Sequence, residues 1–136
     1  DQINKVELNE ISDQIDQMIY VSKYLNSKMI NLSIDSLTSS ELDFLIVDET
    51  NNEILMNGYD EYCHSSLYNN RRDFKNGLIN VNAKKTLVAI NSIDSIIINT
   101  LITDDTFLTI DSIYQNSVTD LDSLLIESVI TINNKK

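Results

Sequence analysis

The chain has 136 residues, of which 21 are Asp or Glu and 10 are Lys or Arg, so its formal net charge at pH 7 is −11. This length predicts a single domain spanning residues 1–136, the 42% of hydrophobic residues predict a packed core, and the negative charge argues against nucleic-acid binding, which needs clustered Lys and Arg. One Cys, two Gly and no Pro exclude a disulfide framework and the Gly-rich loops of many enzyme sites, so we expect neither an enzyme nor a cofactor.

Apolar residues recur at a 3,4 spacing near the N-terminus, which predicts a long helix over residues 1–34. The stripe consists of Leu8, Ile11, Ile15, Met18, Leu25, Met29 and Leu32, with polar Asn4 and Ser22 in the remaining positions. At 1.5 Å per residue such a helix is roughly 40 Å long, which is more than a small domain needs for its own core. Two interpretations stay open: an amphipathic helix lying across a sheet, or a stalk that pairs with a second copy.

The middle of the chain predicts a sheet core over residues 42–116. The continuous apolar run at 44–47 and the run at 54–56 predict two strands, joined by a polar turn at 48–53. Residues 59–76 predict one or two short helices with polar loops. The β-branched runs at 78–81, 86–91, 96–103 and 107–114 predict an antiparallel meander, in which Asp104-Asp105 forms a tight hairpin turn. Ser117 then begins a closing helix over residues 117–134.

Residues 44–56 resemble the first hairpin of PAS-like sensor domains, because an apolar strand ends in Asp48 and a second strand opens with Ile54 and Leu55. The long helix before them is similar to that of extracytoplasmic Cache or PDC sensors. The resemblance implies an α+β fold with an antiparallel PAS-like sheet. It also implies a homodimer through the N-terminal helix, and a membrane tether in flanking segments. The chain begins with Asp1 and not with Met, so we expect it to be part of a longer product.

Residues 59–76 are also the compositional anomaly of the chain, since they hold three of the six Tyr, the single His and both Arg. An Arg side chain binds a carboxylate through two parallel hydrogen bonds, and Tyr supplies an apolar wall with a hydroxyl at its tip. The resemblance places this segment beside a ligand pocket. We therefore predict that the ligand-binding residues are Arg71, Arg72, Tyr62, His64 and Tyr68. The alternative is that the two Arg neutralise neighbouring acidic residues at the surface.

Other chemical patterns are weaker. Cys63 and His64 are adjacent, so their side chains point apart, and the pair predicts neither a nucleophile nor a metal site. Acidic pairs such as Asp48-Glu49 and Asp104-Asp105 read as solvated turns, without the spaced ligands of a calcium loop. We predict no catalytic residue and no metal ligand.

Two functions remain as hypotheses. The first is a non-enzymatic, extracytoplasmic ligand-sensing domain of a membrane signalling protein, which would signal by a shift of its first helix within a dimer. The alternative is a cytoplasmic acidic interaction protein, such as an immunity protein or a secretion chaperone, that binds a basic protein partner. The first predicts a small-molecule ligand, and the second predicts a protein partner of opposite charge.

Overall fold

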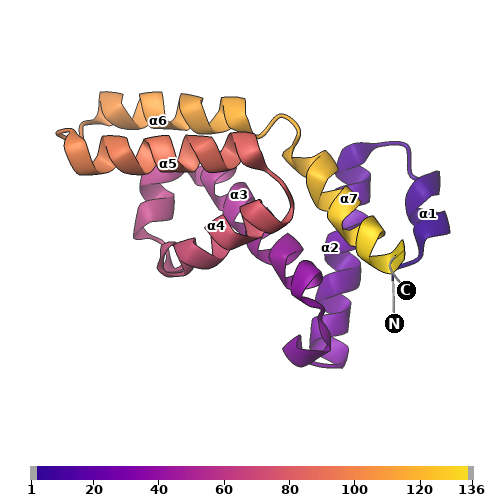
Figure 1. Ribbon diagram of the computed structural model, residues 1–136. Helices are drawn as coiled ribbons and strands as arrows, with labels where there is room; N and C mark the ends of the chain where they lie inside the picture. The colour runs from indigo at the N-terminus through magenta and orange to yellow at the C-terminus, as the bar shows by residue number, and fades with distance from the viewer. Residues whose placement is uncertain (1–2, 135–136) are drawn as a thin grey trace.

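Helices account for all the regular structure in residues 3–134, the part of the chain that the computed structural model describes; side chains are described for residues 3–130. Short 3₁₀ turns at Ile34–Ser36 and Ser66–Asn70 flank α3. The α-helices in chain order are α1 (Lys5–Glu10), α2 (Gln14–Asn31), α3 (Ser39–His64), α4 (Arg71–Asn80), α5 (Lys84–Asn99), α6 (Asp104–Ser117) and α7 (Leu121–Asn134) (Figure 1).

The predicted α+β fold is wrong, because residues 3–134 contain no strand, and a PAS-like or Cache domain cannot exist without its sheet. Burial follows the helical period in the segments predicted to be strands. In α5 the buried residues are Thr86, Ala89, Ile90 and Ile93, a spacing of i, i+3, i+4 and i+7. Helix propensities of β-branched residues differ from the best formers by less than about 1 kcal/mol, whereas burying one Ile contributes about 1.5–3 kcal/mol. Packing of one helical face therefore outweighs the local preference for strands.

The predicted hairpin at 44–56 lies entirely within α3. Phe44, Val47 and Ile54 are buried on one face of this helix. Asn51, which was expected in a turn, is 4% exposed and accepts a hydrogen bond from the Tyr114 hydroxyl over 2.6 Å. Because its side-chain amide is hydrogen-bonded to Tyr114, Asn51 can be buried within α3 without ending the helix. The polar run at 48–53 is therefore helical and not a turn.

The second predicted turn, Asp104-Asp105, forms the first turn of α6. Thr103 is the N-cap and forms a capping box with Thr106, in which each side chain bonds the backbone N–H of the other. Acidic residues stabilise the first turn of a helix because their negative charge interacts favourably with the positive end of the helix dipole. Two acidic residues after a Thr thus mark a helix start in this chain.

The predicted N-terminal helix is divided in two. It is interrupted after Glu10, and α2 begins at Gln14. Its N-cap is Asp13, whose Oδ1 accepts hydrogen bonds from the backbone N–H groups of Ile15 and Asp16 at 2.8 and 3.2 Å. The stripe residues Leu8, Met18 and Leu25 are buried in the chain's own core. Residues 1–2 of the predicted helix lie outside the described residues, and at the other end α7 occupies 121–134.

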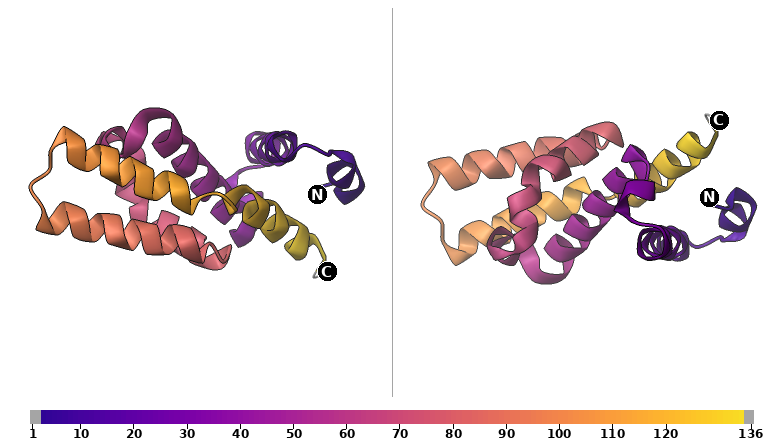
Figure 2. Two further views of the ribbon diagram at one scale, coloured as in Figure 1. Left: turned by 90° about the horizontal axis from the view of Figure 1, so that it is seen from above. Right: turned by 90° about the horizontal axis from the view of Figure 1, so that it is seen from below.

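The helices are arranged around α3 (Figures 1 and 2). α4 packs along α3, and the antiparallel pair α5–α6 crosses one end of it. From there α7 runs back to the other end, where it contacts both α2 and α3. A cluster of aromatic side chains fills the space between α3, α4 and α6 and comprises Tyr59, Tyr62, Phe74 and Tyr114.

A backbone break inside α3 aims the end of that helix at α6. Gly58 has φ +89° and ψ +159°, a combination that is essentially restricted to glycine. The backbone N–H of Tyr59 is thereby released from the helix and donates to Oδ1 of Asp111 in α6 over 2.8 Å. The carboxylate of α6 thus acts as an N-cap for the last turns of α3.

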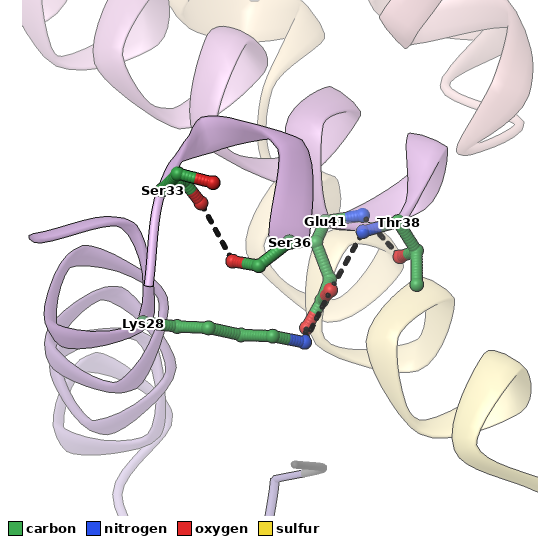
Figure 3. Close-up of polar contacts among 5 residues, drawn as sticks. All are labelled: Lys28, Ser33, Ser36, Thr38 and Glu41. Carbon is green, nitrogen blue, oxygen red and sulfur yellow. Dashed lines mark hydrogen bonds and ion pairs between the residues drawn. The ribbon is translucent and has the colours of Figure 1, made fainter. Parts of the chain in front are cut away.

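At the opposite end, a buried ion pair joins α2 to the start of α3 (Figure 3). The Nζ of Lys28 lies 3.1 Å from Oε1 of Glu41, and the two side chains are only 9% and 8% exposed. The same Glu41 oxygen accepts the backbone N–H of Thr38 at 2.8 Å, while the Thr38 hydroxyl accepts the backbone N–H of Glu41 at 3.1 Å. From this junction α2 and α3 diverge, as Figure 1 shows.

Candidate functional site

The structure divides the predicted ligand-binding residues between core and surface. Tyr62 is 1% exposed and packs edge-to-face against Tyr59 and Tyr68, with ring centroids 5.2 and 5.3 Å apart. Burial, together with the nearby Cys63, raises the pKa of Tyr62. Burial also raises the pKa of the Cys63 thiol to about 11, which disfavours a thiolate at neutral pH. Tyr62 therefore belongs to the core.

The two arginines lie at the edge of this aromatic cluster. The Arg71 guanidinium sits 4.6 Å from the centroid of the Tyr68 ring, and its Nη1 donates to the Tyr68 carbonyl oxygen over 2.9 Å. Arg72 is exposed and lines, together with Arg71, an open hollow of about 530 Å³. His64 is exposed and turns to Asp60, with Nδ1 2.8 Å from its carbonyl oxygen. The structure thus brings Tyr62, Tyr68 and Arg71 together, but Arg72 and His64 do not join them in an enclosed pocket.

A larger cleft lies where α2 and α3 diverge. Its volume is about 820 Å³, and its lining comes from α2, α3 and the first turn of α7. The wall from α2 consists of Ile15, Met18, Ile19, Ser22, Lys23, Asn26 and Met29; α3 contributes Leu45, Asp48, Glu49 and Asn52, and α7 contributes Asp122. The wall from α2 is mainly apolar and the opposite wall is acidic. We call this site the α2–α3 cleft.

Asp48 is the central polar group of the cleft. Its carboxylate accepts hydrogen bonds from the Ser22 hydroxyl at 3.1 Å and from the Asn52 amide at 3.4 Å. Burial raises the pKa of Asp48 in spite of these two bonds, and the neighbouring Asp122 raises it further. Burial likewise raises the pKa of Asp122. Within the described part of the chain no Lys, Arg or His forms an ion pair with either carboxylate.

Such an arrangement favours a cationic ligand. A carboxylate that has lost part of its hydration is destabilised until a positive charge approaches it. The cleft has one cation of its own, Lys23, against three acidic groups, Asp48, Glu49 and Asp122. The exposed side chains of Ile15 and Ile19, at 67% and 47%, offer apolar surface a short distance away. The cleft can therefore hold a group that is apolar on one side and positive on the other.

Sequence reasoning missed this site although it weighed several of its residues. Ser22 was noted as a polar position in the helical stripe, and Asp48 was taken as a solvated acid in a turn. The signal that was available is the spacing of Asp48 and Asn52, which share one helical face at i, i+4. It was hidden because the same residues were interpreted as a turn.

Two further features bear on the type of site. Across the described residues, no group of three or more His, Cys, Asp or Glu side chains is placed to hold a metal ion. None of the helices described here has the length and apolar character needed to cross a membrane. Comparison with models of known protein families, with curated proteins and with solved structures finds no match to this chain.

Proposed function

We propose that this protein is an interaction module that takes a basic, amphipathic helix of a partner protein into the α2–α3 cleft. The observation that carries the proposal is the pair of half-buried carboxylates, Asp48 and Asp122, which line the cleft and form no ion pair within the described chain. A Lys or Arg side chain from the partner would supply the missing charge. The net charge of −11 favours approach of a basic partner at long range.

The dimensions of the cleft support a helix as the occupant. The residues of α2 that line it run from Ile15 to Met29, which corresponds to about 21 Å of helix at 1.5 Å per residue. A partner helix of about 14 residues has that length. Amphipathic helices commonly bind in grooves of this kind, with their apolar side chains against an apolar wall. Here the apolar wall is α2 and the acidic wall is formed by α3 and α7.

This is the second of the two functions considered from the sequence. The ligand-sensing function depended on a pocket between a sheet and residues 59–76, and no sheet exists within residues 3–134. Binding of a basic protein does not depend on a sheet. It requires only a negative surface with apolar side chains beside it, and the α2–α3 cleft provides both.

The test uses a fluorescently labelled helical peptide of about 14 residues, built from leucine and lysine, and its counterpart with glutamate in place of lysine. We expect the lysine peptide to bind and the glutamate peptide not to bind, as measured by fluorescence anisotropy. The double variant Asp48→Asn/Asp122→Asn should weaken binding at least about tenfold, because a buried charge pair loses one partner.

The matched control is the double variant Asp60→Asn/Glu61→Gln. It also removes two negative charges, but at exposed positions near the end of α3 and outside the cleft. Affinity should change by less than about twofold, since exposed charges contribute little. Equal losses in the two double variants would show that the peptide senses only net charge, and would overturn the assignment of the site.

A further inference from the structure

The α5–α6 hairpin, residues 84–117, ends in an apolar tip. Near the connection between the two helices, the exposed fractions are 79% for Ile98, 85% for Leu101 and 68% for Leu108. The tip extends beyond α3 and α4, at the left of Figure 1. Single exposed apolar side chains are common in proteins, but several gathered on one projection form an unpartnered surface.

The base of the same hairpin carries an apolar groove between α5 and α6. Its volume is about 430 Å³. The lining residues are Lys84, Lys85, Val88, Ile113, Asn116 and Ser117. Val88 is 65% exposed although it is apolar. The groove therefore has an apolar floor and two lysines at one end.

The charges of the hairpin are sorted to its two ends. In its middle, Asp94 pairs with Lys75 of α4, and Asp111 accepts the Tyr59 N–H. The charged residues that remain are Lys84 and Lys85 at the base, and Asp104 and Asp105 at the tip. The two ends thus have opposite charge, and each carries exposed apolar side chains.

The positive charge at the base of the hairpin is unfavourable within a single chain. Lys84 and Lys85 occupy the first turn of α5, which has no acidic residue there and an N-cap, Ala83, without a side-chain hydrogen bond. The helix dipole makes that turn favourable for negative and not for positive charge. Lys85 donates to the neutral Thr119 hydroxyl at 3.1 Å, and neither lysine has an acidic partner in the part of the chain described.

We propose that two copies of this chain pair through their α5–α6 hairpins in an antiparallel, twofold arrangement, with the tip of each on the base of the other. The apolar tip then covers the apolar groove, and the aspartates of one copy face the lysines of the other. α5 has 16 residues and spans about 24 Å, so the tip and the base of the hairpin are about 24 Å apart in each copy. Antiparallel alignment therefore forms the same contact twice, as twofold symmetry requires.

This interface is separate from the dimer that the N-terminal helix predicted. Part of that helical stripe, including Leu8, Met18 and Leu25, is already used by the chain's own core. The hairpin also lies apart from the α2–α3 cleft, since none of its residues lines the cleft. A dimer formed through the hairpin would present two clefts and could bind a partner with repeated basic helices more tightly.

Charge exchange provides the test, with molecular mass measured by sedimentation velocity over a concentration series up to about 500 µM. The wild-type chain should dimerise with increasing concentration. Lys84→Glu/Lys85→Glu makes both ends acidic, and Asp104→Lys/Asp105→Lys makes both ends basic. Each variant alone should dimerise at least about tenfold more weakly, because like charges then meet at both contacts.

Mixing the two variants should restore dimers, since each contact again pairs opposite charges, and the variant carrying all four substitutions should dimerise by itself. Leu101→Ser, at an exposed loop position, should weaken the dimer and leave the circular dichroism spectrum unchanged. A monomeric wild-type chain over the whole series would overturn the proposal. Dimers that persist in both charge variants, or no recovery on mixing folded variants, would overturn it as well.

Discussion

Replacing Tyr114 by Phe measures how strongly α6 is held to α3. The Tyr114 hydroxyl donates to Oδ1 of Asn51 over 2.6 Å, and the two residues are 0% and 4% exposed. Phe keeps the ring but leaves the Asn51 oxygen without that donor in a dry site, which costs about 1–3 kcal/mol. For a domain of this size the melting temperature should fall by roughly 4–10 °C.

The matched control is Tyr20→Phe, because the Tyr20 hydroxyl also donates over 2.6 Å, to Oε2 of Glu7, but at an exposed site. Water replaces that bond, so the melting temperature should change by no more than about 2 °C. Thermal denaturation followed by circular dichroism measures both. Asn51→Leu/Tyr114→Phe removes both polar ends and should recover part of the loss. Equal, small shifts in Tyr114→Phe and Tyr20→Phe would refute the argument that burial sets the cost.

Two other predictions concern the cleft and the break in α3. The folded-state pKa of Asp48 is raised above its ordinary value of 3.8, so the stability that it contributes is present at low pH and is lost as the pH rises through that raised pKa. Asp48→Asn should therefore raise the melting temperature at pH 7 and have almost no effect near pH 4; a decrease at pH 7 would contradict this. Gly58→Ala should cost about 1–3 kcal/mol in urea denaturation, because φ +89° and ψ +159° suit only glycine. Met56→Ala, at a position 81% exposed, should cost less than about 0.5 kcal/mol, and equal losses would show that the backbone conformation carries no strain.

The fold class could not be read from the chain because short runs fit two periods at once. In residues 107–114, Ile110 and Tyr114 lie on one face of a strand and also on one face of a helix, since both periods return after four residues. The β-branched residues around them favoured the strand. Only the buried contacts of α6 with α3 and α5 distinguish a helix from a strand here, and a local pattern in residues 107–114 does not contain the residues that make them.

The candidate site was missed for a related reason. Composition drew attention to residues 59–76, where Tyr, His and Arg are concentrated, but packing places Tyr62 in the core, where it has no access to a ligand. The α2–α3 cleft takes Ser22, Asp48 and Asp122 from three separate helices. No local pattern connects residues that are brought together only by the divergence of α2 and α3.

The sequence by itself determined the properties that depend on composition and on long local patterns. These are the charge of −11, the apolar content needed for a core, and the helical stripe that became α2. Tertiary structure decided that residues 42–116 form helices, that Asn51 and Tyr62 are buried, and that Asp48 and Asp122 line one cleft. The physical reason is that helix and strand preferences differ by fractions of a kcal/mol per residue, whereas burial of an apolar side chain stabilises the fold by several times more. Burial arises only when elements distant in the sequence pack against one another.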